Sequence, residues 1–287
     1  MAIDYGDIEK EIKATAALRR MMAGGKTAVA IGAHDAFSAL LVERAGFDAI
    51  YVGSYVTEAA FLGKPDLALM TKTERLSIVR NIVKSVDIPV IADVEEGYGN
   101  AVSVMDTIRD FEAAGVAGVH LDDEDIPSKC PFVPGIPHNT LVSVDEMCGK
   151  IEAAVKARQD PDFLIIARSD VIGTKSRARY YEEDGMAEVA RRSNAYLEAG
   201  ADAAFIMALT ESELDYFSKE VNGPMVGIFA PAEPLPVSAF RKAGCCLTIG
   251  SIVCLYAAAK GMISALEELK RTEDWNAITD RLIDDKE

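Results

Sequence analysis

The stretch Ile88-Pro-Val-Ile-Ala-Asp93-Val-Glu95-Glu96-Gly-Tyr-Gly-Asn100 holds the pattern around which the rest of the chain is arranged. An apolar run that predicts a buried strand passes directly into a carboxylate at Asp93, and a second carboxylate follows at Glu95. Alternate side chains of an extended backbone point the same way, so these two should converge at the end of the strand. Their oxygen atoms suit a hard cation such as Mg2+. The alternative is an ordinary acidic turn, with Asn100 capping the helix that follows.

The same succession of a short apolar run and a longer amphipathic stretch recurs along the whole chain. Four predicted helices end at an Ala-Gly pair just before a strand, which suggests repeated units that share a glycine cap. Eight strands with eight crossovers predict a (β/α)8 barrel that forms one domain over residues 1–287. A doubly wound open sheet is the alternative, but its glycine-rich phosphate fingerprint is missing after the first strand. The predicted strands are 28–32, 49–53, 89–93, 118–122, 163–168, 203–207, 225–229 and 246–250, and the predicted helices are 1–26, 36–45, 71–86, 101–114, 143–158, 185–199, 211–220, 236–243 and 252–270.

Composition narrows the class of protein. The 287 residues are 49% hydrophobic, which is enough for one barrel-sized domain. The net charge of −16 argues against a nucleic-acid partner, although a few arginines and a cation can still attract an anionic substrate into one cleft. No segment resembles a signal peptide, and no apolar run approaches the ~18 residues of a membrane span. The five cysteines lack zinc-type spacing, so we predict a cytoplasmic, reduced protein without a membrane partner.

Polar side chains occur where the predicted strands end. Strands three, four and five end at Asp93, Asp122 and Arg168, and in a barrel such ends gather the chemistry at one face. The planar fork of an arginine suits a carboxylate or phosphoryl group, although Arg168 could equally form a structural ion pair. Tyr51 lies on the second strand. His120, inside the fourth strand, is predicted to be a packing residue without a role.

The longest segment without periodicity, residues 123–142, contains four prolines and is predicted to be a functional loop. Cys130 follows Lys129, whose charge can lower the pKa of a thiol, so this cysteine is a candidate proton donor or nucleophile. The alternative is an ordinary loop thiol, and His138 is similarly ambiguous. The acidic run 122–125 carries more charge than one metal needs, so part of it is predicted to be solvated loop.

Four motifs in order resemble the isocitrate lyase/phosphoenolpyruvate mutase superfamily, over roughly residues 15–265. They are Ala92-Asp93-x-Glu95-x-Gly-Tyr-Gly-Asn100, Leu121-Asp122-Asp123, Asp160-Pro-Asp-Phe-x-Ile-Ile-Ala-Arg168 and Ala199-Gly-Ala-Asp202. The resemblance implies a (β/α)8 barrel, Mg2+ as cofactor with Mn2+ as the alternative ion, and enolate chemistry on a small carboxylic acid. It also implies a homo-oligomer, a dimer of dimers whose last helix is exchanged between subunits.

The resemblance assigns roles to individual residues. Asp93 matches the main metal-binding aspartate of the family. Glu95 stands where the family usually has aspartate, and Asp122 where it usually has glutamate, both near the metal. Asp66 matches an acidic residue that contacts the water shell of the metal, and Arg168 matches the arginine that grips a substrate carboxylate.

Other positions bear on the branch of the superfamily. Tyr51 matches a tyrosine that the carbon–carbon lyases use near the substrate hydroxyl, which favours a lyase. The Lys129-Cys130 pair is similar to the gating loop of those lyases, but it continues Pro-Phe instead of Gly-His. Met207 and the Ile-Phe-Ala of 228–230 replace the polar residues of methylisocitrate-type lyases. Because apolar side chains poorly accommodate a third carboxylate, we expect a smaller or more apolar acid.

Together these patterns predict a Mg2+-dependent lyase that cleaves a carbon–carbon bond of a 2-hydroxy dicarboxylate through an enolate. Tyr51 would assist removal of the hydroxyl proton, Cys130 would protonate the enolate, and the amides of Gly53, Ser54 and Tyr55 would bind a carboxylate oxygen. An oxaloacetate decarboxylase or hydrolase, or a phosphonopyruvate-processing enzyme, could use the same site. A barrel that binds a metabolite without catalysis is a third alternative.

Overall fold

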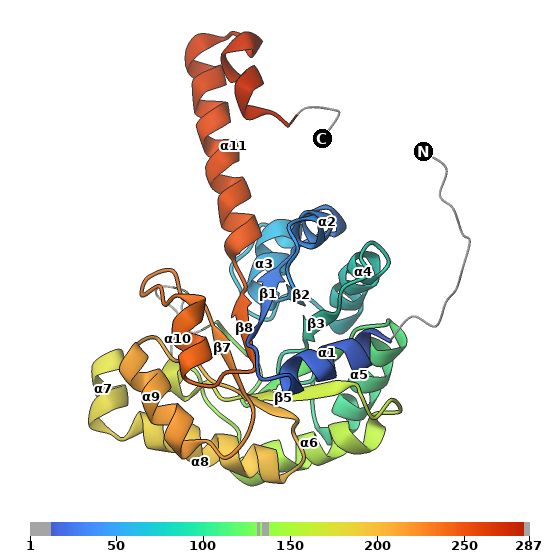
Figure 1. Cartoon of the computed structure of the whole chain (residues 1–287), viewed down its shortest axis with the longest axis vertical. Coiled ribbons are helices and arrows are strands. Elements are labelled where there is room, and N and C mark those ends of the chain that lie inside the picture. Colours follow the sequence, from blue (N-terminus) through green and yellow to red (C-terminus); the bar gives the residue numbers. More distant parts are fainter. Residues whose placement is uncertain (1–12, 131–132, 134–137, 284–287) are drawn as a thin grey trace.

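The computed structural model describes residues 13–130, 133 and 138–283. Eight parallel strands close into a barrel in chain order, with helices around it (Figure 1). Pairing of the first strand with the last confirms the predicted (β/α)8 barrel and excludes the open sheet. The strands are almost entirely buried, because helices cover their outer face while side chains fill the interior. They are β1 (Ala28–Gly32), β2 (Ala49–Val52), β3 (Val90–Asp93), β4 (Gly118–Asp122), β5 (Leu164–Arg168), β6 (Ala203–Phe205), β7 (Met225–Ile228) and β8 (Leu247–Gly250).

All the predicted helices within the described residues are present, with ends that differ by a few residues. Residues 1–12 of the predicted first helix lie outside the described residues. Periodicity did not predict the short helical segments after β2 and β5 or the one at 275–281, since such short segments carry little amphipathic signal. The helices are α1 (Ala14–Ala23), α2 (Ala36–Arg44), α3 (Ser54–Thr57), the π-helical turn Glu58–Leu62, α4 (Lys72–Val83), α5 (Ala101–Ala113), α6 (Val144–Ala157), the 3-10 turn Val171–Thr174, α7 (Arg177–Glu182), α8 (Gly185–Glu198), α9 (Glu211–Glu220), α10 (Val237–Lys242), α11 (Val253–Thr272) and the 3-10 helix Trp275–Arg281.

The turn between β3 and α5 has an unusual backbone. Asn100 caps α5, since its side chain accepts hydrogen bonds from the amides of the first turn, as predicted. Gly97 has φ +90°, and a Cβ there would approach Val104 to 2.4 Å, so only glycine fits. Glu95 and Tyr98 also adopt positive φ, of 52° and 58°, a conformation that costs energy in residues with a side chain. Such strain persists only where the surroundings enforce it, and it is common at functional sites.

The last long helix, α11, extends away from the barrel (Figure 1). None of its 20 residues is buried, and its apolar side chains Met262, Ile263 and Leu266 are each more than half exposed. The 3-10 helix Trp275–Arg281 folds back beside it, and Trp275 is 71% exposed. Within the described residues, no helix has both the length and the apolar character needed to cross a membrane.

Candidate active site

The carboxyl ends of three adjacent strands bring charged side chains together. Asp93, Asp122 and Arg168 are the last residues of β3, β4 and β5. The strand register pairs Asp122 with Arg168 and places His120 opposite Asp93. We call this end of the barrel, around Asp66, Asp93, Glu95 and Asp122, the acidic mouth. The structure thus brings together the strand-end residues that the sequence predicts.

Asp93 is 1% exposed and has a fixed orientation. Its Oδ1 accepts a hydrogen bond from the amide of Glu95 at 2.9 Å, and its Oδ2 accepts one from the amide of Ser54 at 3.0 Å. Burial tends to raise the pKa of Asp93, but the nearby His120 and two arginines hold that pKa well below its ordinary value. Asp93 is therefore an ionised carboxylate aimed into the mouth.

His120 lies at the centre of the site, which corrects the prediction that it only packs. Its Nε2 is 2.6 Å from the hydroxyl of Tyr51, and its Nδ1 is 2.9 Å from Oδ1 of Asp122. Burial opposes its protonation, but Asp93 and Asp122 raise the pKa of His120 to about 9. The available signal was its spacing of two from Asp122, because alternate residues of a strand face the same side.

Tyr51 stacks on the ring of His120, with centroids 5.5 Å apart. Its burial and the neighbouring Asp93 raise the pKa of Tyr51 well above its ordinary value, so the phenol keeps its proton. With both nitrogens of His120 protonated, Nε2 donates to the phenol oxygen. The phenol hydrogen is then free to point toward the mouth, where Oδ2 of Asp93 lies 3.5 Å away.

Glu95 and Asp66 are both connected to Asp93 by hydrogen bonds that do not involve His120. The amide of Glu95 donates to Asp93, and Ser54 donates to both Asp93 and Asp66. Glu95 pairs with Arg75 of α4 at 2.7 Å, and Asp66 accepts a 2.8 Å hydrogen bond from the hydroxyl of Ser54. Burial and the charge of Asp93 raise the pKa of Glu95 well above its ordinary value and that of Asp66 to about 7. The sequence prediction missed Arg75, although it shares the buried face of α4 with residues four and seven positions later.

Arg168 combines the two roles that the sequence left open. Its Nε and Nη2 donate to Oδ1 of Asp170 at 3.1 and 2.9 Å, which is a structural ion pair. Its Nη1 lies 3.7 Å from Asp122, at the mouth, and its guanidinium covers the ring of Phe205. One edge of the fork is therefore anchored and the other faces the site.

The remaining predicted binding residues follow β2 and β6. A Cβ at Gly53 would approach the ring of Tyr51 to 2.6 Å, so glycine permits the close packing of this turn. The amide of Ser54 is engaged by Asp93, and the hydroxyl of Tyr55 bonds to that of Tyr256 on α11 at 2.6 Å. Met207 is 4% exposed and lies two residues beyond the end of β6.

The long loop after β4 is attached to the mouth. The amide of Cys130 donates to the carbonyl of Asp66 at 3.3 Å. Glu124 accepts a hydrogen bond from the amide of Lys129 at 2.7 Å and another from the side chain of Asn139. Of the acidic run 122–125, only Asp125 is exposed, so the part predicted to be solvated loop is this one residue. His138 is exposed, and residues 131–132 and 134–137 lie outside the description.

The residues of the acidic mouth fit a divalent cation. Carboxylate oxygens of Asp93 and Asp122 lie within 4.8 Å of one another, as do those of Glu58, Asp66 and Glu95. Buried carboxylates outnumber the arginines beside them, and burial raises the pKa of Asp122 to about 6. A hard cation bound by carboxylate oxygens would relieve this crowding, and Mg2+ prefers such ligands.

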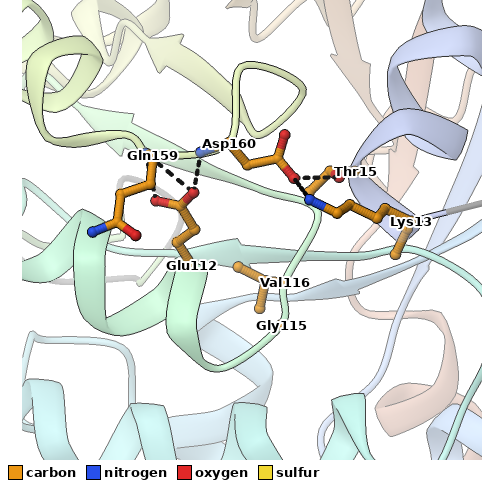
Figure 2. A pocket seen from close by; sticks show the side chains of 8 residues that line it. Lys13, Thr15, Glu112, Gly115, Val116, Gln159 and Asp160 are labelled. Atoms are coloured by element: carbon orange, nitrogen blue, oxygen red, sulfur yellow. Dashed lines mark hydrogen bonds and ion pairs between the residues drawn. The ribbon is translucent and has the colours of Figure 1, made fainter.

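A hollow lies at the opposite, amino end of the barrel, near the start of β4 and β5. It measures about 460 Å³ and is lined by Lys13, Thr15, Glu112 and Asp160 (Figure 2). Asp160 accepts hydrogen bonds from Thr15 and Lys13, while Glu112 accepts them from the amides of Gln159 and Asp160. We call these residues the amino-end seam. Its carboxylates already have donors, so it joins α1 to the barrel rather than forming the site.

The fold and the site together define a (β/α)8 barrel with a buried acidic cluster, suited to a divalent cation, at its carboxyl end. Residues 18–270 match the family model of phosphoenolpyruvate phosphomutase. The chain therefore belongs to the phosphoenolpyruvate mutase/isocitrate lyase superfamily, as its motifs predicted.

Individual members show the range of the superfamily. The chain is 37% identical over 272 residues to a 2,3-dimethylmalate lyase of Eubacterium barkeri, covering 93% of this chain and 90% of that protein. A phosphoenolpyruvate phosphomutase from Streptomyces platensis subsp. rosaceus superposes with a TM-score of 0.86 at 32% identity, covering 94% and 92% of the two chains. A phosphonopyruvate hydrolase in complex with oxalate and Mg2+ gives a TM-score of 0.84 at 30% identity, covering 96% and 93%.

Proposed function

We propose that this protein is a Mg2+-dependent lyase that cleaves a carbon–carbon bond of a 2-hydroxy dicarboxylate through an enolate. The observation that carries the proposal is the arrangement of Tyr51 and Arg168 around Asp93, in a chain 37% identical to a 2,3-dimethylmalate lyase. A barrel that only binds a metabolite would not need a tyrosine buried against a histidine–aspartate pair. We propose one domain, residues 1–287.

Asp93 and Asp122 would hold Mg2+, with Glu95 and Asp66 beside them, and Mn2+ is the alternative ion. When bound, the cation would stabilise the negative charge that develops on the oxygens of the reacting acid. The support is their burial and their close grouping around one another.

The protein's own groups would carry the remaining steps. Nη1 of Arg168 would bind a substrate carboxylate, while Asp170 keeps the guanidinium from turning. The phenol of Tyr51 would accept the substrate hydroxyl proton as the carbon–carbon bond breaks and would release its own proton to the ionised Asp93, whose Oδ2 lies 3.5 Å away, while protonated His120 donates to the phenol oxygen. The two bonding electrons remain on the departing fragment as an enolate. Cys130, on the loop tied to Asp66, would protonate that carbon.

The proposed substrate is small and partly apolar. Met207 is buried beyond β6, and Phe205 packs under the guanidinium of Arg168. These side chains offer no hydrogen bonds to a further carboxylate, and burying an unpaired carboxylate is costly. The amides of Gly53 and Tyr55 would bind the free oxygen of the carboxylate that Arg168 grips.

A second candidate is a phosphonopyruvate-processing enzyme, or a decarboxylase or hydrolase acting on oxaloacetate. The similarity to the phosphonopyruvate hydrolase with oxalate and Mg2+ favours it, because oxalate resembles a flat enolate with two adjacent oxygens. Such an enzyme would use the same acidic mouth, and it would not need Tyr51 to take a hydroxyl proton.

An NMR assay with Mg2+ separates the candidates. The substrates are 2,3-dimethylmalate, methylisocitrate, oxaloacetate and phosphonopyruvate, each with and without EDTA. We expect 2,3-dimethylmalate to be consumed to pyruvate and propanoate, and EDTA to stop the reaction. Consumption of oxaloacetate or phosphonopyruvate alone would support the second candidate, and activity unaffected by EDTA would exclude the metal.

We also propose that the protein works as a homo-oligomer, a dimer of dimers in which α11 packs on a neighbouring subunit. The exposed apolar side chains of α11, such as Ile263 and Leu266, support this assembly because a lone helix gains little stability in water. Sedimentation of the wild type and of Leu266→Glu tests it. We expect the variant to dissociate into smaller species, and an unchanged sedimentation coefficient would exclude this use of α11.

A further inference from the structure

Arg75 is an arginine that the proposed reaction does not use, and it is 0% exposed. It lies in α4, outside the barrel wall, and reaches to the carboxyl end of the strands. Arginine is almost never fully buried unless it is paired, because its charge must be compensated when it leaves water. Its location beside the acidic mouth therefore calls for a reason beyond packing.

The guanidinium of Arg75 joins two segments of the site. Nη2 donates to Oε1 of Glu95 at 2.7 Å, and Nη1 donates to the hydroxyl of Thr57 at 2.6 Å. That hydroxyl in turn donates to the carbonyls of Gly53 and Ser54 at 2.8 and 3.1 Å. Arg75 thus connects the turn after β2 with the turn after β3.

Glu95 is held from both sides. Its Oε1 meets Arg75, and its Oε2 accepts a 3.3 Å hydrogen bond from Ser128 of the long loop. Its backbone has φ +52°, a strained conformation for a residue with a side chain, so the partners of the carboxylate must stabilise it. The result is that Glu95 lies with Asp66 and Glu58, while Asp93 lies with Asp122.

We propose that Arg75 is a positioning residue that fixes the carboxylate of Glu95 and thereby sets the affinity of the acidic mouth for Mg2+. This inference rests on the proposed function, because it needs the cation. A planar fork suits this task, since it holds Glu95 and Thr57 at once with a fixed angle between them. The ammonium group of a lysine is a single point charge and would hold only one of these two partners.

Positioning and simple electrostatics predict opposite results. If Arg75 acted only through its positive charge, removing it would make the mouth more negative and would tighten Mg2+ binding. If it acts by holding Glu95, removing it lets the carboxylate turn away and weakens binding. Loss of a partner that orients a metal ligand typically weakens metal binding by about 10–100-fold.

Isothermal titration of the full-length chain with Mg2+ tests the proposal. We expect Arg75→Met to weaken binding by about 10-fold or more and Arg75→Lys to weaken it less. In the Glu95→Gln background, Arg75→Met should change the affinity by less than about 3-fold, because the group it holds is already altered. Tighter or equal binding by Arg75→Met, or an undiminished effect in the Glu95→Gln background, would overturn the proposal.

Arg158→Met is the matched control. Arg158 pairs with Asp202 at 2.7 Å at the amino end of the barrel, so its loss also removes an ion pair but should leave Mg2+ affinity unchanged. Far-ultraviolet circular dichroism checks the fold of each variant. If Arg75→Met does not fold, two comparisons remain. Arg75→Lys is compared with the wild type, and the Arg75→Met/Glu95→Gln double variant, which leaves no unpaired charge, is compared with Glu95→Gln.

The two proposals fail in different ways. If the wild-type chain binds no Mg2+ and turns over no acid, the proposed function fails. If the wild type binds Mg2+ and cleaves substrate while every Arg75 variant binds Mg2+ equally well, only the role of Arg75 is excluded.

Discussion

The two ends of the barrel both collect carboxylates, but they treat them differently. At the amino-end seam, Asp160 and Glu112 meet amides, a hydroxyl and Lys13, which is 77% exposed on its side chain, so water and donors satisfy the charge. At the acidic mouth, Asp93 and Asp122 are nearly inaccessible and lie within a few ångströms of each other. Burying like charges costs free energy. A fold retains such an arrangement where a bound cation offsets the cost or where the reaction needs the buried charges. The contrast supports the proposal that the mouth is the functional end.

The largest expected effect comes from removing the central carboxylate of the mouth. Asp93→Ala should lower kcat/KM by on the order of 10³-fold, because the cation and the reacting oxygens lose their main anchor. The corresponding change at the seam, Asp160→Ala, should leave kcat/KM within about 2-fold. Steady-state kinetics with 2,3-dimethylmalate provide the measurement. Full activity of Asp93→Ala would remove the distinction between the two ends.

Tyr51→Phe comes next in size. The phenol is the group placed to take a proton, and loss of such a group typically costs about 10²–10⁴-fold in rate. Because the ring still stacks on His120, KM should change little while kcat falls. Steady-state assays over a range of substrate concentrations determine kcat and KM separately. A kcat above half that of the wild type would mean that the mouth does not need this phenol, as in the phosphonopyruvate and oxaloacetate alternatives.

Cys130→Ser tests the thiol beside the mouth, whose backbone amide is bonded to Asp66, with a smaller expected effect. If the thiol protonates the enolate, we expect kcat to fall by about 10²-fold, since a serine hydroxyl is a much weaker acid. A solvent deuterium isotope effect on kcat that is larger in Cys130→Ser than in the wild type reports that protonation has slowed. Near-normal turnover of Cys130→Ser would favour the decarboxylase or hydrolase reading over the lyase.

The barrel itself was predictable because its signals are local. Each strand is a short apolar run, each returning helix ends near a glycine, and Asp93, Asp122 and Arg168 follow their strands directly. Parallel strands then place their carboxyl ends together without any further information.

Other parts of the site depend on contacts between distant segments. His120 has the sequence signature of a core residue, and only the barrel brings it against Tyr51 from β2 and makes it part of the mouth. The periodicity of α4 likewise indicates that Arg75 is buried, but it does not indicate which side chain Arg75 contacts. The pairing of Glu95 with Arg75 joins positions 20 residues apart, a relationship that no local pattern encodes.

The smallest expected effect concerns stability at the seam. Hydrogen bonds from the amide of Asp162, Thr15 and Lys13 hold the pKa of Asp160 below its ordinary value. A carboxylate with a lowered pKa in the folded state stabilises the protein above its unfolded pKa of about 3.9, and this contribution disappears as the pH falls through the folded value. Asp160→Asn should therefore lower the free energy of unfolding by about 1 kcal/mol at pH 7, as for one lost hydrogen-bonding carboxylate. The difference from the wild type should shrink as the pH falls from 4 toward 2. Urea unfolding across this range measures it, and a difference that stays constant with pH would show that the ionised carboxylate contributes nothing to holding α1 against the barrel.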